Sequence, residues 1–457
     1  MENALPTSID SYDDAVQWIY GRINYERVRP QKLSTHFRLE RVEKLLSVIG
    51  SPQQRIPAVH IAGTKGKGST AAILNSILVS SGIRTGLFTS PHIELFEERL
   101  CVNGAMPNQS QLTELVTELQ DRLSHADPDI VADGPTYFEV ATLLAWMFFD
   151  QQKVEIAVLE TGLGGRLDCT NVCSPLLTII TSIGLDHTDI LGDTLPLITA
   201  EKAGILKQNV PLLTWVHQPE VIEVIRNRAA QLSCDVYWRD SHIQVATHQS
   251  NGLADQCISV TTPQTVHPNL HLPLLGRHQA GNAALAVAAA DVLSRQERRI
   301  TAQTIATGVS QTHWPLRFEH FGNNPTIILD AAHNPDSVAA FVETCQEQFG
   351  DRPATLIFAS SRDKDAATML KIVAPRFQQI VLTKFERNPR AIGTEQLTVM
   401  LQDAITVGHF PAPEIHVAET PTESLQVARR IVAHDGVICC AGSIFIAAEL
   451  RTLLAES

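Results

Sequence analysis

Nearly continuous apolar runs alternate with helical patterns along the first half of the chain. Five such runs predict strands, at 57–63, 84–90, 154–160, 176–184 and 210–215. A helical pattern that Gly82 can end follows the first run, and another helix is expected over 136–150. Val, Ile and Leu runs that alternate with helices are typical of a mostly parallel sheet covered on both faces.

The pattern changes after about residue 234. Shorter alternating segments with polar turns over 234–273 predict a small antiparallel extension, and a helix is expected over 281–294. The strand–helix alternation then starts again, with strands predicted at 326–330, 354–360, 379–384 and 436–442. We therefore predict an α/β fold with two domains.

The expected division lies just ahead of the second series of strands. It gives a large N-terminal domain over 1–308, a linker over 309–316 and a smaller C-terminal α/β domain over 317–457. A length of 457 residues exceeds one ordinary core and agrees with this division.

Composition and charge exclude several classes of protein. Hydrophobic residues make up 44% and charged residues 19% of the chain, and the apolar stretch LLAWMFF is too short to cross a bilayer. A net charge of −13 argues against a nucleic-acid partner, although a local basic pocket for a small anion is compatible with it. The acidic start has neither a basic leader nor an apolar signal core, so we expect a cytoplasmic protein without a membrane partner.

The cysteines are scattered and include no CxxC pair. We therefore expect buried, reduced thiols in a cytosolic enzyme. The eight positions are Cys101, Cys169, Cys173, Cys234, Cys257, Cys345, Cys439 and Cys440.

The segment HIAGTKGKGST (60–70) carries the clearest chemical signal. Its glycines lie between a predicted strand and a predicted helix, where backbone N–H groups and the helix N-terminus can surround an anion. Lys67 can reach the terminal phosphates of a nucleotide, and the Ser69 hydroxyl can face a metal ion. The segment departs from GxxxxGK[ST] in its glycine spacing and in Gly68, which separates lysine from serine. A flexible strand–helix turn is the alternative.

Two side chains stand at the ends of predicted strands, where α/β proteins present ligand-contacting groups. Glu160 ends the strand VEIAVLE, and His187 follows another strand in SIGLDHTDILG. Because Mg²⁺ binds few carboxylates together with phosphate oxygens and waters, Glu160 near a phosphate-binding loop is a candidate ligand. The alternative to a ligand role for His187 is a histidine that is hydrogen-bonded in a turn. Lys202 in AEKAGIL is a further candidate, and the alternative for it is a place on the solvated face of a helix.

The motifs, taken in order, resemble those of one family. GTxGKGS, TSPH, LExGLGGRLDxTN, TSIxLDHTDxLG, EKAGI, NAA, RFE, DxAHNP, DKD and GS occur over nearly the whole chain from about residue 38. Each motif is weak alone, but together they resemble the folylpolyglutamate synthase/dihydrofolate synthase family, the folate branch of the Mur ligase superfamily. The resemblance implies a P-loop ATPase domain of the Mur ligase type, followed by a smaller Rossmann-like α/β domain.

The resemblance also implies a reaction: ATP-dependent addition of L-glutamate to dihydropteroate, and of γ-linked glutamates to reduced folates. A carboxylate does not react directly with an amine, so transfer of the γ-phosphoryl group of ATP would first make an acyl phosphate. The glutamate amine would then displace phosphate. The implied cofactor is Mg²⁺, with two ions per site, and the expected protein is a monomer.

The resemblance implies four groups of site residues. The ATP-binding residues would be Gly63, Thr64, Lys65, Gly66, Lys67, Gly68, Ser69, Asn282, Arg317 and Asp330. The metal ligands would be Ser90, Glu160, His187 and Lys202, the last as a carbamate, and the catalytic residues would be Lys67, Glu160, His187 and Lys202. The residues that bind the pterin substrate would be Thr136, Tyr137, Arg166, Leu167 and Asp168.

Further candidates have equally good structural explanations. Lys364 and Arg390 are expected near the ligand cleft or in a solvated loop, and His333 and Asn334 at a strand end have no assigned role. Tyr137 could stack on a flat ring or face the core at the start of a helix.

Two departures from the family pattern concern the first-substrate pocket. HFRLER (36–41) has Arg38 where bacterial members have a glycine, and Cys169 replaces an alanine. Folylpolyglutamate synthase activity alone is therefore the nearest alternative. Gly68 and the LGGRLD and DHTD signatures disfavour a peptidoglycan ligase. A regulatory nucleotide-binding protein would have no reason to assemble several metal ligands and a second α/β domain.

Overall fold

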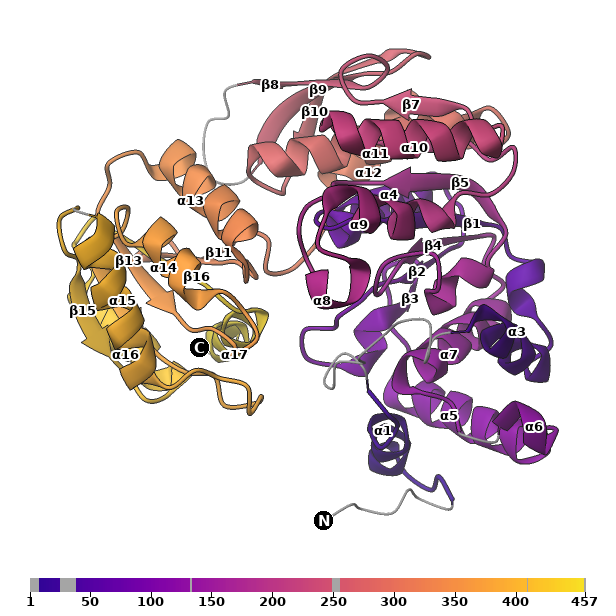
Figure 1. Ribbon diagram of the computed structural model, residues 1–457, viewed down its shortest axis with the longest axis horizontal. Helices are drawn as coiled ribbons and strands as arrows, with labels where there is room; N and C mark the ends of the chain where they lie inside the picture. The colour runs from indigo at the N-terminus through magenta and orange to yellow at the C-terminus, as the bar shows by residue number, and fades with distance from the viewer. Residues whose placement is uncertain (1–7, 25–37, 132–133, 249–254, 409, 456–457) are drawn as a thin grey trace. The chain divides into compact units, whose positions relative to one another are not determined.

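The computed structural model describes residues 8–24, 38–131, 134–248, 255–408 and 410–455 (Figure 1). The described residues form two compact units. The first unit consists of 1–246, 258–271 and 281–312, and the second of 247–257, 272–280 and 313–457, in each case within the described ranges. The main division of the chain falls between Thr312 and His313, and two short earlier segments group with the second unit.

A seven-stranded sheet forms the centre of the first unit, in the order β3-β2-β4-β1-β5-β6-β7 (Figure 1). The strands are β1 (Ala58–Ala62), β2 (Thr85–Phe88), β3 (Leu100–Val102), β4 (Ile156–Glu160), β5 (Pro175–Ile180), β6 (Leu212–Thr214) and β7 (Val236–Trp238). β2 and β3 are antiparallel, and the other neighbours are parallel. The five strands predicted for this region and their mostly parallel arrangement are confirmed.

Strand β1 lies at the middle of this sheet and is buried along its whole length. The chain continues from β1 to β2 on one side of it and later returns through β4 to β5 on the other side. In α/β proteins, ligands bind at the carboxyl ends of the strands where the strand order reverses in this way. The segments that follow β1, β2, β4 and β5 therefore meet at the edge where a ligand site is expected.

Helices cover both faces of the sheet. Helix α4 contacts β1, β2 and β4 and packs against α12, whereas Ala58 and Leu159 point into a second core that α1, α3, α5 and α7 complete. The α-helices are α1 (Tyr12–Tyr20), α3 (Leu39–Val48), α4 (Lys67–Ser80), α5 (Gln109–Ser124), α6 (Pro128–Val131), α7 (Tyr137–Gln151), α8 (Thr188–Leu191), α9 (Leu195–Lys202), α10 (Pro219–Gln231), α11 (Arg277–Ser294) and α12 (Ala302–Ser310). Short 3₁₀ helices are η1 (Pro52–Gln54), η2 (Phe96–Arg99), η3 (Cys169–Val172) and η4 (Ala203–Ile205).

The region expected to form a small antiparallel extension is divided in the structure. β7 pairs in parallel with β6 and therefore extends the main sheet, which corrects that expectation. Its three residues, Val236, Tyr237 and Trp238, are all half-buried, and the strand is too short for its sequence to show which sheet it joins. β8 (Gln244–His248), β9 (Gln256–Thr261) and β10 (Val266–Leu272) form a separate sheet in the order β10-β9-β8.

The second unit has a six-stranded sheet in the order β11-β12-β16-β13-β14-β15. The strands are β11 (Glu319–Phe321), β12 (Thr326–Leu329), β13 (Ala354–Phe358), β14 (Gln379–Leu382), β15 (Glu414–Val417) and β16 (Val437–Ala441), and the helices are α13 (Pro335–Phe349), α14 (Ala366–Val373), α15 (Thr394–Gly408), α16 (Pro421–Ile431) and α17 (Ile444–Ala455). β11 is antiparallel to β12, and the other neighbours are parallel. The predicted α/β class is confirmed, but β11 and β15 are additional edge strands, which have no buried residues to reveal them.

The eight cysteines form no disulfide bond among the described residues. Five cysteines are buried as expected, whereas Cys101, Cys234 and Cys257 are half-buried. None of the described helices combines the length and the apolar character that crossing a bilayer requires.

Candidate active site

The glycine-rich segment forms the turn between β1 and α4, as the sequence predicts. Gly63 has a φ of +155° and Gly66 a φ of +83°, a region that residues with side chains rarely adopt. A Cβ atom on Gly63 would also collide with the hydroxyl of Thr181, and one on Gly66 with the side-chain amide of Asn282. Because α4 begins directly after this turn, the turn and the helix N-terminus together form an arrangement suited to an anion.

The segment that follows β5 holds the glycine-rich turn in place. The backbone N–H of Thr64 donates to the Ser182 carbonyl at 2.7 Å, and the N–H of Lys65 donates to the Ser182 hydroxyl at 3.1 Å. The Thr181 hydroxyl donates to the Lys65 carbonyl at 2.6 Å. These contacts hold the backbone of the turn from a neighbouring strand of the sheet.

The structure brings Lys67, Glu160 and Ser90 together from three segments. Glu160 ends β4, and its residue is only 4% exposed. The Lys67 ammonium lies 3.8 Å from one Glu160 carboxylate oxygen, and the backbone N–H of Ser90 donates to the other at 3.2 Å. The site therefore has a buried carboxylate beside the lysine of the glycine-rich turn.

Asp186 joins the glycine-rich turn to the segment that carries His187. Its carboxylate lies 2.6 Å from the Lys65 ammonium and accepts the backbone N–H of His187 at 3.0 Å. His187 has a φ of +50° and immediately precedes α8, and its side chain is 40% exposed. His187 was predicted from the LDHTD motif, whereas Asp186, the acidic residue next to it, was not among the predicted site residues.

Lys202 lies at the end of α9 and is only 5% exposed. Its ammonium donates to the Gly63 carbonyl at 2.8 Å, which places it under the glycine-rich turn. Burial, together with the positive charge of Lys67, lowers the pKa of Lys202 to about 7. A solvated helix face, the alternative considered from the sequence, does not describe this buried lysine.

Replacing Lys202 with methionine should make stability less dependent on pH. The pKa of Lys202 falls from 10.5 in the unfolded chain to about 7 in the folded protein. Below pH 7 this lysine therefore lowers the free energy of unfolding by its full amount, and this loss shrinks as the pH rises toward 10.5. Between pH 7 and pH 10, we expect the unfolding free energy of the wild type to rise by about 3 kcal/mol relative to that of Lys202→Met. Denaturant titrations in CO₂-free buffer measure this difference, and a difference independent of pH would contradict the lowered pKa.

The donor set around the turn is compatible with Mg²⁺. Among the residues that the structure describes, no cluster of three or more His, Cys, Asp or Glu side chains could hold a metal ion. Mg²⁺ commonly uses one or two carboxylates together with phosphate oxygens and waters, so it does not need such a cluster. Glu160 at the strand end and Ser69 in the first turn of α4 offer a carboxylate and a hydroxyl next to the proposed phosphate position.

The predicted pterin residues at the start of α7 have structural partners. Thr136 caps the helix, accepting the backbone N–H of Glu139 at 3.3 Å while the Glu139 carboxylate accepts the N–H of Thr136 at 2.7 Å. Tyr137 is 1% exposed and stacks on Tyr20, with 5.5 Å between ring centroids, and packs edge-on against Phe96. Tyr137 thus has the core-facing surroundings that were the alternative to ring stacking on a ligand.

The predicted residues of the GGRLD segment serve the loop after β4 in different ways. Arg166 is exposed and forms an ion pair with Glu201 at 2.8 Å, and Leu167 is half-buried. Asp168 is buried, and its carboxylate accepts the backbone N–H groups of Gly162 and Leu163 at 2.9 and 3.0 Å. Burial raises the pKa of Asp168, and these hydrogen bonds oppose the rise.

The two departures from the family pattern lie close to these elements. Arg38 directly precedes α3, and three residues later Arg41 forms an ion pair with the buried Glu139 at 3.1 Å. His36 and Phe37, the first residues of HFRLER, lie outside the described residues. Cys169 follows Asp168 and is buried, and burial raises the pKa of its thiol well above the usual value.

Two predicted ATP-binding residues, Arg317 and Asp330, belong to the second unit. Arg317 stands between Leu316 and Phe318, whose φ values of +55° and +52° are unusual for residues with side chains. The Asp330 carboxylate accepts the backbone N–H of Phe318 at 2.8 Å and so supports this segment. Burial raises the pKa of Asp330 to about 6, and the charge of Arg317 opposes the rise.

The remaining candidates lie at the loops of the second unit. Asn334 caps α13 by accepting a hydrogen bond from the backbone of Ser337 at 3.0 Å. The side chains of Lys364 and Arg390 lie 4.0 and 3.6 Å from the same carboxylate, that of Asp363. His333 bonds through its ring to the backbone of Ala331. Asp363, which joins two candidates, was not selected from the sequence.

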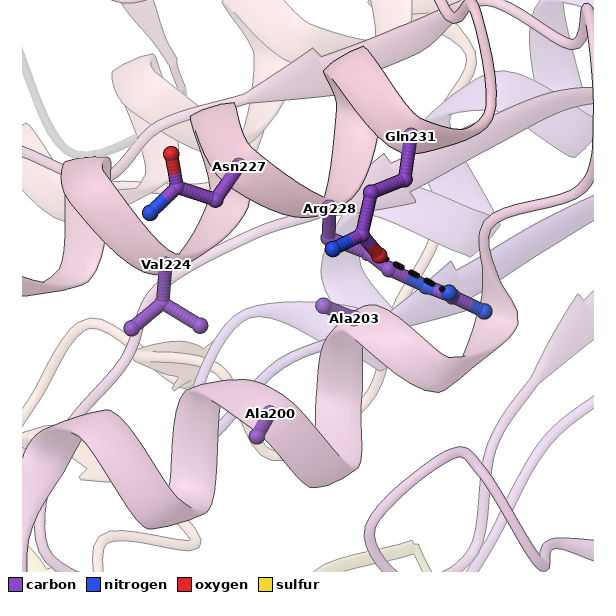
Figure 2. A pocket seen from close by; sticks show the side chains of 6 residues that line it. All are labelled: Ala200, Ala203, Val224, Asn227, Arg228 and Gln231. Atoms are coloured by element: carbon purple, nitrogen blue, oxygen red, sulfur yellow. Dashed lines mark hydrogen bonds between the residues drawn. The ribbon is translucent and has the colours of Figure 1, made fainter.

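Figure 2 shows a pocket of about 280 Å³ between α9 and α10. Its lining residues are Ala200, Ala203, Val224, Asn227, Arg228 and Gln231. The Arg228 guanidinium donates to the Gln231 side chain across one side of it, at 3.3 Å. No predicted site residue is among these six, so the pocket is separate from the glycine-rich turn.

Comparison with known families matches both parts of the chain. Residues 61–290 match the Mur ligase middle domain, and residues 316–444 match the Mur ligase glutamate ligase domain. The dihydrofolate synthase/folylpolyglutamate synthase of Bacillus subtilis is 33% identical over 447 residues, which cover 97% of this chain and 99% of that protein.

Solved structures give the same result for the fold. The folylpolyglutamate synthase of Mycobacterium tuberculosis complexed with ADP has a TM-score of 0.84 and 29% identity, covering 93% of this chain and 97% of that one. A complex described as FPGS–AMPPCP–folate has a TM-score of 0.82 and 27% identity, covering 97% of this chain and 100% of that one.

Proposed function

The chain belongs to the Mur ligase family, in its folylpolyglutamate synthase/dihydrofolate synthase branch, and on this premise we propose roles for the residues of the site. The protein is an ATP-dependent carboxylate–amine ligase that adds L-glutamate to folates. The observation that carries the assignment of roles is the meeting of Lys67, Glu160 and Lys202 around the glycine-rich turn. A regulatory nucleotide switch and a peptidoglycan ligase are not supported by the full-length similarity to this branch.

The first step activates the acceptor carboxylate. One of its oxygens attacks the γ-phosphorus of ATP, the bond to the ADP oxygen breaks, and an acyl phosphate forms. In our proposal, the backbone N–H groups of residues 63–69 and the N-terminus of α4 bind the phosphates, and Lys67 offsets charge on the transferring group. Asn282, packed against Gly66, would define one wall of the nucleotide site. Arg317 and Asp330 are also proposed as ATP-binding residues.

The second step forms the amide bond. The amine of L-glutamate attacks the carbonyl carbon of the acyl phosphate, and the tetrahedral intermediate expels inorganic phosphate. The proton lost by the amine leaves with phosphate or solvent. Since the reactants are all anionic, the contribution of the protein is mainly to position them and to offset their charge.

We propose that Mg²⁺ is held by Glu160, Ser90 and His187, with a second ion held by a carbamate on Lys202. When bound, Mg²⁺ would offset the negative charge of the phosphates. The lowered pKa of Lys202 supports the carbamate, because the neutral amine adds to the carbon of CO₂ and releases a proton to solvent. Carbon-13 NMR of protein in labelled bicarbonate would detect this group, and its signal should be absent in Lys202→Met.

We propose that the acceptors include both dihydropteroate and reduced folates. The near-complete match to a relative named for both activities supports this, whereas Arg38 and Cys169 are departures at the first-substrate side. Thr136, Tyr137 and the Arg166–Asp168 segment would shape the pterin site through the loop and the helix that they hold. A glutamate-dependent assay of phosphate release with dihydropteroate and with tetrahydrofolate separates the two activities. Turnover with tetrahydrofolate alone would leave folylpolyglutamate synthase as the sole activity.

We further propose that the protein acts as a cytoplasmic monomer with a division into domains over 1–308 and 317–457, joined by 309–316. The break between Thr312 and His313 supports this division into domains. Light scattering of the purified protein, with and without ATP, would test the monomer.

A further inference from the structure

A chain of buried hydrogen bonds runs from β1 to the loop after β4. The His60 ring nitrogen Nε2 lies 2.8 Å from the Thr170 hydroxyl, and that hydroxyl donates to one carboxylate oxygen of Asp168 at 2.5 Å. The other oxygen of Asp168 accepts the backbone N–H groups of Gly162 and Leu163. The chain thus joins the strand that leads into the glycine-rich turn to the segment that follows Glu160.

The direction of these bonds fixes the tautomer of His60. A threonine hydroxyl has a single hydrogen, and that of Thr170 is donated to Asp168, so the hydroxyl can only accept from His60. His60 therefore carries its proton on Nε2. Burial lowers the pKa of His60 to about 3, so the ring is neutral and donates this hydrogen bond at physiological pH.

All three side chains are buried, with exposures of 0% for His60, 1% for Thr170 and 5% for Asp168. A buried carboxylate is costly unless donors satisfy both of its oxygens. The Thr170 hydroxyl and backbone N–H satisfy one oxygen of Asp168, which leaves the other to hold the two loop amides. The chain is therefore a support for the backbone of residues 162–168. Removing the Thr170 hydroxyl takes away the only side-chain donor to Asp168 in this chain and weakens the hold on its carboxylate, which keeps its backbone N–H donors.

The glycine-rich turn is supported differently. Thr181 and Ser182, at the end of β5, bond to the backbone of residues 64 and 65 and take no part in the His60 chain. Loss of the Thr170 hydroxyl should therefore disturb the loop after β4 while leaving the phosphate-binding turn in place. This separation makes the two supports distinguishable by kinetics.

We propose that His60 and Thr170 are positioning residues for the folate acceptor, because through Asp168 they fix the loop that carries Arg166 and Leu167. The proposal rests on the ligase activity and on the pterin-side role of this loop proposed above. Neither His60 nor Thr170 touches the reacting atoms. Their effect is exerted through backbone N–H groups of the loop, so it should appear in acceptor binding and not in nucleotide binding.

The test compares Thr170→Val with Thr170→Ser by steady-state kinetics with tetrahydrofolate, ATP and L-glutamate. Valine keeps the shape of threonine and removes the hydroxyl, whereas serine keeps the hydroxyl. For Thr170→Val, we expect the KM for the folate acceptor to rise about tenfold, since a hydrogen bond to a charged group is lost. The KM for ATP should change by less than about twofold, and Thr170→Ser should recover most of the acceptor affinity.

A second pair of variants tests His60. Leucine at position 60 removes the donor, whereas glutamine can present an N–H group near the position of Nε2. His60→Leu should raise the acceptor KM and His60→Gln should restore it. Because both substitutions interrupt one chain, the double variant with Thr170→Val should resemble Thr170→Val alone. If Thr170→Val does not fold, the His60→Leu and His60→Gln pair provides the same comparison.

Thr344→Val is a matched control, since it removes a buried threonine hydroxyl in the second unit that donates to Ala340 within α13. Its acceptor KM should equal that of the wild type. Three results would each overturn the positioning role. The first is an equal rise in the KM values for ATP and for the acceptor, and the second is an acceptor KM of Thr170→Ser as high as that of Thr170→Val. The third is a double variant in which the effects of the two single substitutions on the acceptor KM multiply. A wild type without glutamate-dependent turnover would overturn the proposed function itself, and with it this inference.

Discussion

Lys67→Ala should abolish glutamate-dependent ATP hydrolysis and leave the protein folded. Lys67 begins α4, and its ammonium lies beside the buried carboxylate of Glu160. The charge of the transferring phosphoryl group would develop at this place. Removing a group that stabilises such charge lowers kcat by about 100- to 1,000-fold. Phosphate release in the presence of ATP, L-glutamate and tetrahydrofolate measures the loss, and circular dichroism checks the fold.

Lys44→Ala is the matched control, because Lys44 is an exposed residue of α3 away from the glycine-rich turn. It should keep wild-type turnover. If Lys67→Ala also keeps turnover within about threefold of the wild type, the assignment of the glycine-rich turn to the transferred phosphate is wrong.

Glu160→Gln should lower kcat by about 100-fold or more and raise the concentration of Mg²⁺ needed for half-maximal rate. Glutamine has nearly the same shape and can still accept the backbone N–H of Ser90, so the fold should persist. It lacks the negative charge that a metal ligand supplies and that Lys67 faces at 3.8 Å. Titration of the rate with MgCl₂ separates a weaker metal site from a general loss of activity.

Glu155→Gln provides the control on the same stretch of chain. Glu155 is exposed just before β4 and pairs with Arg299 at 2.7 Å on the surface. Its substitution should leave both kcat and the Mg²⁺ requirement unchanged. An unchanged Mg²⁺ requirement in Glu160→Gln would contradict the proposed metal ligand, even if kcat falls.

The elements that position the site were predictable because their signals are local. β1 and β4 are nearly continuous apolar runs, and the turn between β1 and α4 needs glycines for its φ values and for the close approach of Thr181 and Asn282. These requirements depend only on a few adjacent residues of the sequence. Edge strands such as β15, which has no buried residue, carry no comparable signal.

The partners of the site residues were less predictable, because they come from distant parts of the chain. Asp186 binds Lys65 from a position 121 residues away, and Thr170 bonds to His60 across 110 residues. Both stand within motifs that were visible in the sequence, but only the fold shows which atoms meet. The same holds for Tyr137, whose burial against Tyr20 depends on how α1 packs.

Transfer of oxygen from the acceptor to phosphate tests the central claim most directly. Tetrahydrofolate labelled with oxygen-18 in its γ-carboxylate is incubated with the protein, ATP, Mg²⁺ and L-glutamate, and the released phosphate is examined by mass spectrometry. An acyl phosphate intermediate requires one labelled oxygen to appear in the phosphate for each amide formed. Amide formation with unlabelled phosphate, or no amide at all, would contradict it.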